Sequence, residues 1–492
     1  MPEWPEPAAS SFSCAGGPLW LLPHVATRQQ QQPAPGALAW RLPGTGGVNR
    51  LLTACPGVVQ DVGAAALFPG ALLSCGKRGA AYRLGTLLYF GPRSRVWRAR
   101  RLPGGVEAVI KIVDASSAER RRAAELERRL LESIAASAAV PSSGPAAGAY
   151  THWSRLREAW HGAVDLGAGG TDCVLLAMAP LHESMAYVLH RQGARGRRRG
   201  LPLDAVRGLA AQALTALDAL HREQRAVHRD VKPSNLLLAQ PFFVRSQGGT
   251  CRARVRSLSL PEMCSARWAL ADLGSAAALA PVLRWEWSPS RLWAVLPRLR
   301  QEASGELPYE TPSYSPPEAV LHLPATPAWD MWALGCTLFE AATGTVLFGG
   351  IEDAATTLGS DAAGEGSSSS GGGGGLRRLW EQSRESSARA PSDLAVDAAH
   401  LALVRALVGP APRRVLDRSP LAATFYDSRG ELRLQLPSRR ALAQRLVDSG
   451  SLDAAQAVDL AAFLEPLLRF DADERPSARE ALAHPWLLRQ ER

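Results

Sequence analysis

Hydrophobic periodicity divides the chain into a strand-rich part followed by a helix-rich part. Between residues 82 and 113, three short apolar segments (GTLLYF, SRVWRAR and EAVIKIV) are separated by turn residues, which is typical of consecutive β-strands. The next segment, SAERRRAAELERRLLESIAAS, has a strong helical period, and DCVLLAMAP predicts a buried strand that ends in a proline-marked turn. We therefore expect a small β-rich lobe with one helix.

The remainder predicts mainly helices. LPLDAVRGLAAQALTALDALHRE spaces Leu, Val and Ala as a helix of about six turns would. AVHRDVKPSNLLL follows as a loop entering a strand, RWALADLGSA holds another strand, and four later helices are expected in WDMWALGCTLFEAATG, DAAHLALVRALVG, AVDLAAFLEPLLRF and SAREALAHPWLL. The predicted class is α+β, with an N-lobe at about residues 81–180 and a larger, mainly helical C-lobe at about 181–490.

Other regions lack a sustained period. Residues 1–80 are rich in Pro, Ala and Gly and include QQQQ, so we predict a disordered N-terminal extension. Loop-like insertions are expected at about 240–265, 281–306 and 350–395. The third contains SSSSGGGGG and predicts a flexible excursion.

Composition narrows the environment and the partners. The seven cysteines include no C-x-x-C pair, which favours reduced thiols in the cytoplasm or nucleus over a disulfide or zinc framework. The sequence contains no run of about 18 apolar residues that would predict a membrane span. We therefore expect a soluble protein with no membrane partner. Nothing in the sequence indicates an oligomeric state. GARGRRRG is either a solvated loop or a nuclear-import or RNA contact.

Lysine and asparagine are scarce enough to be informative. The 56 Lys and Arg residues comprise only three lysines, Lys77, Lys111 and Lys232, and the asparagines are Asn49 and Asn235. This exclusion indicates a chain-wide bias toward Ala, Gly, Arg and Pro. Much of the net charge of +10 is therefore interpreted as solvated arginine, and direct nucleic-acid binding is not expected. Where a disfavoured residue persists, its chemistry is hard to replace.

The segment HRDVKPSN carries the central chemical signal. His228-Arg229-Asp230 with Lys232 and Asn235 matches the protein-kinase catalytic loop H-R-D-x-K-x-x-N. In that loop the aspartate accepts the proton of a substrate hydroxyl, the lysine neutralises charge on the phosphate, and the asparagine reaches a metal ion. We therefore predict that Asp230, Lys232 and Asn235 are catalytic, with Asn235 also a metal ligand.

Two further residues fit the same chemistry. Asp272-Leu273-Gly274 follows an apolar strand in the position of the D-F-G motif, where the aspartate would bind Mg²⁺. Lys111, at the end of AVIK, is the lysine expected to bind the α- and β-phosphates of ATP. Arginine would replace such a lysine poorly, because its wide planar head is not a compact point charge. The helix after this strand should supply a glutamate that pairs with Lys111, with Glu127 favoured over Glu125.

Three downstream residues are assigned by position. Pro316-Pro317-Glu318 stands in the A-P-E position, and Glu318 is expected to form a buried ion pair with Arg475. Asp330 stands where protein kinases anchor the backbone of the catalytic loop. Thr311 is expected beside that loop, which would favour Ser/Thr substrates.

Outside the insertions, residues 82–490 resemble a eukaryotic protein kinase and are most similar to the SR-protein kinases of the CMGC group, which phosphorylate serines in Arg/Ser-rich splicing factors. ADLGSA, FEAATGTVLF and the segment from YDSRGELRLQLPSRR to the end carry this similarity. It implies a two-lobed fold with ATP and Mg²⁺ between the lobes and Ala177 and Ala179 as hinge residues beside the nucleotide. It also implies protein substrates, with Arg/Ser-rich proteins as candidates. TPSYS departs from the family's T-R-x-Y-R, since Pro312 and Ser315 replace both arginines.

The stretch LLYFGPRSRVWRAR stands where a kinase carries its glycine-rich loop. Gly91 fits the second glycine, Ser94 matches a serine that SR-protein kinases carry in place of the third, and Val96 matches the valine that follows. Tyr89 occupies the place of the first glycine. We predict that Gly91, Ser94 and Val96 bind the nucleotide, with weaker or altered ATP affinity and with chemistry retained. The alternative hypothesis is a pseudokinase that acts as a scaffold.

Overall fold

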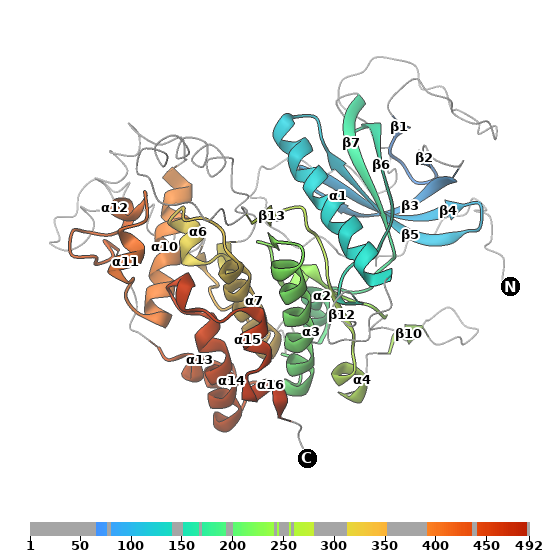
Figure 1. The fold of residues 1–492 in the computed structure, drawn as a ribbon. Coiled ribbons are helices and arrows are strands. Elements are labelled where there is room, and N and C mark those ends of the chain that lie inside the picture. Colours follow the sequence, from blue (N-terminus) through green and yellow to red (C-terminus); the bar gives the residue numbers. More distant parts are fainter. Residues whose placement is uncertain are drawn as a thin grey trace, which may run out of the picture. The chain divides into compact units, whose positions relative to one another are not determined.

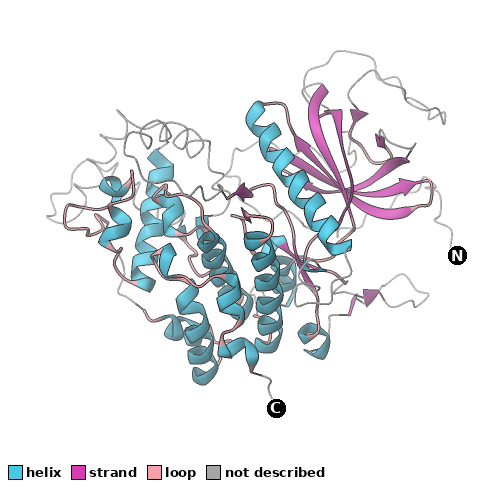
Figure 2. Ribbon diagram, viewed as in Figure 1, coloured by secondary structure: helices cyan, strands magenta, loops and turns pink. Residues whose placement is uncertain are grey.

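The computed structural model describes residues 65–75, 80–139, 151–166, 170–192, 200–240, 244–245, 255–256, 260–279, 312–351, 391–434 and 440–489. The chain divides into two compact units, one made of Met1–Asp114 with Trp160–Leu175, the other of Ala115–Ala159 with Leu176–Arg492. Strands dominate the first unit and helices the second (Figure 1 and Figure 2), which confirms the α+β class. The division differs from a single boundary near residue 180, because helix α1 (Ala118–Ala139) belongs to the second unit.

Seven strands form one sheet in the order β1-β6-β7-β5-β4-β3-β2. Their bounds are β1 (Ala65–Ala66), β2 (Leu72–Cys75), β3 (Ala80–Phe90), β4 (Ser94–Leu102), β5 (Val106–Asp114), β6 (Leu156–Asp165) and β7 (Gly170–Met178). Strands β3, β4 and β5 pair antiparallel, as the three adjacent apolar segments predicted. Alternate residues of these strands, such as Tyr82 and Ile110, are buried in the core, and Tyr82 stacks on Trp160.

The sheet begins before the boundary predicted at residue 81. Strands β1 and β2 lie within the segment that was expected to be disordered, so this expectation is wrong for their residues. They have only two and four residues, too few to show a sustained period. Residues 1–64 and 281–306 and most of 350–395 lie outside the described residues. The insertion at 240–265 contains a short antiparallel pair, β10 (Val244–Arg245) with β11 (Val255–Arg256), and helix α4 (Leu260–Cys264).

The second unit is mainly helical. Its remaining helices are α2 (Met185–Gln192), α3 (Leu203–Arg222), α6 (Pro317–Val320), α7 (Pro327–Thr343), α10 (Pro391–Val408), α11 (Arg413–Leu416), α12 (Ala422–Phe425), α13 (Leu442–Asp448), α14 (Ala454–Leu467), α15 (Ala478–Leu482) and α16 (Pro485–Leu488), with 3₁₀ turns η2 (Pro233–Asn235), η3 (Pro312–Tyr314) and η4 (Ala472–Glu474). Helix α7 is buried along almost its whole length and packs against α3 and α14. It ends at Gly344, whose φ of +74° suits glycine. Among the described helices, none has the length and apolar character that crossing a membrane requires.

Two short strand pairs arrange the loops of this unit. β8 (Ala226–Val227) pairs with β13 (Ala277–Ala278), and β9 (Leu236–Leu238) pairs with β12 (Trp268–Leu270). Because Leu236 faces Leu270 in the register, Asn235 lies beside Ala271, and the Ala271 N–H donates to the Asn235 carbonyl at 2.9 Å. The loops before β9 and after β12 are thereby brought together.

The predicted ion pair between Glu318 and Arg475 is confirmed. Arg475 Nη1 lies 2.6 Å from Glu318 Oε1, and Nη2 lies 2.8 Å from Oε2, in a bidentate arrangement. Both side chains are buried, and Arg475 also donates to the carbonyls of Ala328 and Phe470. The pair therefore connects α6 to the segment before α15.

Replacing Glu318 by alanine should lower the free energy of unfolding by about 3–5 kcal/mol, because it leaves the Arg475 charge buried and uncompensated. The matched control is Asp417→Ala, which removes the exposed i,i+4 partner of Arg413 and should cost less than about 1 kcal/mol. Urea unfolding of both variants, followed by circular dichroism, measures the difference. Equal losses in the two variants would contradict the buried role of the pair.

Candidate active site

Asp330, in the first turn of α7, holds the backbone of the catalytic loop as predicted. Its Oδ2 accepts hydrogen bonds from the His228 N–H and from His221 Nε2, both at 2.8 Å, and its Oδ1 accepts the Arg229 N–H at 2.8 Å. The carboxylate is fully buried. Arg229 has a φ of +65°, a conformation that costs a non-glycine residue about 1–3 kcal/mol. The Asp330 carboxylate stabilises the backbone in this conformation.

His228 connects two loops of the site. Its ring is buried against Trp153, with ring centroids 6.2 Å apart. Nδ1 accepts the backbone N–H of Asp230 at 3.3 Å, and Nε2 lies 3.2 Å from the Ala271 carbonyl. In this pattern Nδ1 is the acceptor and Nε2 is the donor to the Ala271 carbonyl. His228 thus ties the loop that carries Asp230 to the residue before Asp272.

The three residues predicted to be catalytic meet around the Asp230 carboxylate. Lys232 Nζ lies 2.9 Å from Asp230 Oδ1, and Asn235 Nδ2 donates to Asp230 Oδ2 at 2.8 Å and to its backbone carbonyl at 2.8 Å. Burial raises the pKa of Asp230 above its ordinary range, Lys232 opposes that shift, and the neighbouring Asp272 adds to it. The carboxylate is therefore held in one orientation by groups on its own loop.

Asp272 follows β12 and has a φ of +69°, another left-handed non-glycine residue. Its Oδ1 accepts the Gly274 N–H at 3.1 Å, which stabilises the turn. The Asn235 Nδ2 donates to Asp230, so the Asn235 Oδ1 is the atom of this amide that would bind a metal ion. That oxygen and the Asp272 carboxylate are the hard oxygen donors that Mg²⁺ prefers. Among the described residues no group of three or more His, Cys, Asp or Glu could hold a metal.

In the first unit, the predicted nucleotide-binding residues share one sheet face. Lys111 is buried in β5 and faces Val96 in the register, and Val96 faces Tyr89. Directly opposed residues of antiparallel strands point to the same face. The Gly91 N–H donates to the Ser94 carbonyl at 3.0 Å and closes the turn between β3 and β4. This N–H is therefore engaged within the loop itself.

The two candidate glutamates of α1 have different surroundings. Glu127 is buried, whereas Glu125 forms ion pairs with Arg128 and Arg129 on the helix surface. The geometry favours Glu127 as the residue available for a buried role. Its pairing with Lys111, which belongs to the other unit, stays a prediction.

Ala177 and Ala179, the predicted hinge residues, lie at and just after the end of β7. Ala177 is buried, and the Ala179 N–H donates to the Arg155 carbonyl at 2.8 Å. Ala179 can therefore offer a nucleotide only its carbonyl, and the next residue, Pro180, has no N–H. Thr311, predicted beside the catalytic loop, lies outside the described residues, as do residues 193–199 of GARGRRRG.

Two contacts that the sequence did not reveal hold the segment before Glu318. The Tyr314 hydroxyl donates to the buried carboxylate of Glu340 in α7, and His400 Nε2 in α10 donates to the Ser315 carbonyl at 2.9 Å. These partners are separated by 26 and 85 residues, so no local pattern could have shown them. They hold this segment against α7 and α10.

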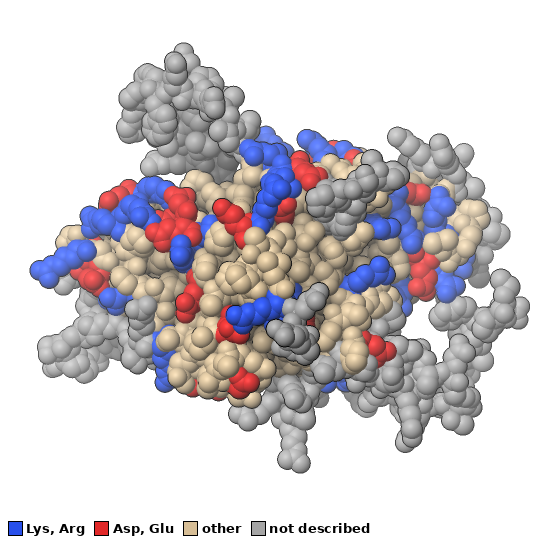
Figure 3. Space-filling view, turned by 60° about the horizontal axis from the view of Figure 1, so that its bottom comes forward, with Lys and Arg blue, Asp and Glu red and all other residues tan. Residues whose placement is uncertain are grey.

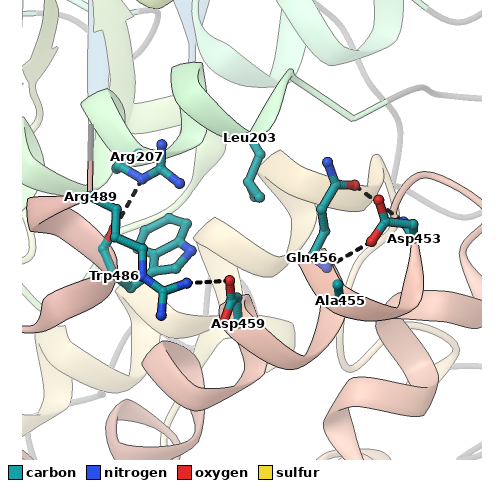
Figure 4. A pocket seen from close by; sticks show the side chains of 8 residues that line it. All are labelled: Leu203, Arg207, Asp453, Ala455, Gln456, Asp459, Trp486 and Arg489. Carbon is teal, nitrogen blue, oxygen red and sulfur yellow. Dashed lines mark hydrogen bonds and ion pairs between the residues drawn. The ribbon is translucent and has the colours of Figure 1, made fainter. Parts of the chain in front are cut away.

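A cavity of about 330 Å³ lies among the beginnings of α3 and α14 and the α16 region (Figure 4). It is lined by Leu203, Arg207, Asp453, Ala455, Gln456, Asp459, Trp486 and Arg489. Its charged groups are already engaged: Arg207 donates to the Trp486 carbonyl at 3.0 Å, and Arg489 pairs with Asp459. Asp453 caps α14 through the Gln456 N–H. These groups serve packing, and none belongs to the catalytic loop.

On the face shown in Figure 3, the residues that the structure describes form no concentrated basic groove. Arginine side chains there are interspersed with Asp and Glu. The described chain contains ion pairs of this kind, such as Arg414 with Asp471 and Arg418 with Asp473. The pattern agrees with the interpretation of the positive charge as solvated arginine.

The family of this chain follows from comparison with known proteins. A model described as "Protein kinase domain" matches residues 171–487, which is more than half of the chain. The chain belongs to the protein kinase family. The match begins in β7 and includes Asp230, Asn235, Asp272 and Asp330.

This kinase has curated relatives at modest identity. It is 25% identical to "Serine/threonine-protein kinase SRPK" of Physarum polycephalum over 429 residues, which cover 82% of this chain and 85% of that protein. It is 26% identical to "Serine/threonine-protein kinase AFC2" and 24% identical to "Serine/threonine-protein kinase AFC1", both of Arabidopsis thaliana. Each of these matches covers 59% of this chain, and the chain spans about half the length of the two AFC kinases (55% and 50%). The predicted resemblance to SR-protein kinases is confirmed as a similarity.

Substituting Asp330 by asparagine should loosen the catalytic loop of this kinase, because an amide can direct only one oxygen at three donors. We expect faster amide hydrogen exchange in a peptide spanning residues 226–231 and a loss of about 2–4 kcal/mol of unfolding free energy. Asp218→Asn, which weakens the surface pair with Arg222 on α3, is the control. Unchanged exchange in residues 226–231 would refute the anchoring role of Asp330.

His400 should make the protein acid-sensitive. Burial lowers its pKa to about 4, whereas an unfolded histidine titrates near 6.5. The folded state therefore disfavours the charged ring, so stability is complete above about pH 6.5 and falls progressively toward pH 4, by up to about 3 kcal/mol. Urea midpoints at pH 7, 5.5 and 4.5 should decline less steeply in His400→Leu than in the wild type. Parallel declines would show that another group is responsible.

Proposed function

We propose that this chain is a serine/threonine protein kinase that transfers the γ-phosphoryl group of ATP, bound with Mg²⁺, to hydroxyl groups of protein substrates. The observation that carries the proposal is the set of contacts around Asp230. Lys232 and Asn235 orient its carboxylate on a loop that Asp330 and His228 hold in place.

Each residue has a specific task in this proposal. Asp230 orients the substrate hydroxyl and accepts its proton, and its raised pKa makes it a stronger base than an ordinary carboxylate. Lys232 neutralises charge on the phosphoryl group in transfer. The Asn235 Oδ1 and the Asp272 carboxylate would hold Mg²⁺, which neutralises negative charge on the phosphates. Lys111, oriented by Glu127, binds the phosphates as a compact point charge.

The similarity to SR-protein kinases extends the proposal to substrates. We propose that Arg/Ser-rich proteins are among them and that the kinase acts in the cytoplasm, the nucleus or both. The mixed surface charge in Figure 3 is compatible with a basic substrate, since acidic side chains are present among the arginines. A peptide library comparing Arg/Ser repeats with other basic peptides tests the preference directly.

A second candidate is a pseudokinase that acts as a scaffold. The observation in its favour is the closed turn of the nucleotide loop, where the Gly91 N–H is used by Ser94 and Tyr89 replaces a glycine. Under this hypothesis the catalytic loop would keep its shape without transferring phosphate.

Asp230→Asn should abolish transfer, by at least about 100-fold, while retaining ATP binding, because the substrate hydroxyl loses its proton acceptor but the nucleotide contacts remain. Lys232→Arg should also lose most activity, since a planar guanidinium cannot replace a compact charge. Transfer from radiolabelled ATP with Mg²⁺ to a generic basic protein measures both, and Arg414→Lys on the surface is the control. Wild-type protein that binds ATP but shows no transfer would support the scaffold instead.

A further inference from the structure

The Tyr89 side chain covers the turn between β3 and β4. A Cβ atom added at Gly91 would collide with the Tyr89 hydroxyl and would lie only 2.6 and 2.7 Å from two carbons of its ring. The phenol therefore folds back over the backbone of Gly91 and occupies the space that a side chain there would fill. A side chain at residue 91 would therefore require the half-exposed Tyr89 ring to move, and Gly91 itself has no left-handed φ.

The phenol lies on the sheet face that carries Lys111. Tyr89 opposes Val96, and Val96 opposes Lys111, so the three residues form one row across β3, β4 and β5, which in β3 follows a register shift between Leu87 and Tyr89. Tyr89 is half-exposed, whereas Lys111 is buried. The row therefore runs from the half-exposed Tyr89 to the buried Lys111, the proposed phosphate-binding lysine.

Arg95 also contacts this turn. It belongs to the neighbouring row, in which Phe90 opposes Arg95 and Arg95 opposes Ile112. Its guanidinium lies 3.7 Å above the centre of the Phe90 ring and donates to the carbonyls of Gly91 and, at 3.2 Å, Ser94. Burial lowers the pKa of Arg95, and Asp114 opposes that shift. Tyr89 and Arg95 therefore both contact the turn.

We propose that Tyr89 is a nucleotide-contacting residue whose hydroxyl binds the phosphates of ATP, with Arg95 as the positioning residue that holds the turn in place. A glycine-rich loop ordinarily contributes backbone N–H groups to the phosphates. Here the Gly91 N–H already donates to Ser94, so the loop offers fewer such groups. A phenol hydroxyl on the Lys111 face supplies a donor to the same anions. This inference rests on the proposed ATP-dependent function. In it, the Tyr89 hydroxyl takes over the phosphate contact that the first glycine of the loop would otherwise provide.

The experiment measures the affinity of the full chain for ATP, ADP and adenosine by isothermal titration calorimetry. Tyr89→Phe removes only the hydroxyl, and we expect the Kd for ATP and ADP to rise about tenfold while that for adenosine stays unchanged, since a hydrogen bond to a charged phosphate is lost. The control is Tyr426→Phe, which removes a buried hydroxyl that has no hydrogen-bond partner in the part of the chain described. Its nucleotide affinities should match those of the wild type.

Arg95→Gln tests the positioning role. We expect the KM for ATP to rise by about threefold to tenfold with kcat nearly unchanged, because the turn becomes looser while the catalytic loop is untouched. Arg100→Gln, the same change in β4 at an exposed residue, is the matched control. A fall in kcat with an unchanged KM would contradict positioning of the phosphate-binding turn.

The outcomes separate this inference from the proposed function. Unchanged ATP affinity in Tyr89→Phe, alongside normal transfer by the wild type, overturns the inference alone. Tighter ATP binding by Tyr89→Gly would show that the ring obstructs the site, and an equal loss of adenosine affinity in Tyr89→Phe would place the contact away from the phosphates. Either result also overturns it. Wild-type protein that neither binds ATP nor transfers phosphate refutes both proposals.

Discussion

The candidate active site depends on one buried carboxylate. Asp330 accepts three hydrogen bonds, from the backbone of His228 and Arg229 and from the ring of His221, and it does so without exposure to water. Hydrogen bonds to a charged acceptor are stronger than neutral ones, and a buried charge is costly unless its partners are present. The loop and α7 therefore stabilise each other. Anchoring His228 and Arg229 also fixes the position of Asp230, since it follows them directly in the chain.

Residues that act from one short segment could be predicted from the sequence. Asp230, Lys232 and Asn235 are separated by at most five residues, so their spacing alone requires them to share a loop, and the scarcity of lysine and asparagine marked them further. Asp272 is remote in sequence, but an apolar strand before it placed it at a strand end. The register of β9 with β12 then brings Asp272 beside the loop. The long helices were equally predictable, because each repeats its period over several turns.

Contacts between distant segments could not be predicted. Tyr314 meets Glu340, and His400 meets the Ser315 carbonyl, only because α7 and α10 pack beside the same turn. From the sequence, Tyr89 is only the loss of a glycine. The direction of its side chain depends on the strand register and on neighbouring residues, which the sequence does not show. Strands β1 and β2 were missed for a simpler reason, since they are too short to show a period. The sequence therefore indicated the catalytic residues better than the long-range contacts that hold their segments in place.

Two of the four left-handed non-glycine residues in the described part of the chain lie where the chemistry is proposed. Arg229 and Asp272 both adopt left-handed φ values, although neither is glycine and glycine is abundant in this chain. Each such residue costs about 1–3 kcal/mol and persists only where surrounding contacts enforce it. Asp330 enforces the first, and the Gly274 N–H donated to the Asp272 carboxylate supports the second. Glycine would relieve the strain at residue 272 but remove the carboxylate. The requirement for that side chain therefore outweighs the backbone preference, whereas the nucleotide loop, whose role is mainly backbone, could exchange a glycine for Tyr89.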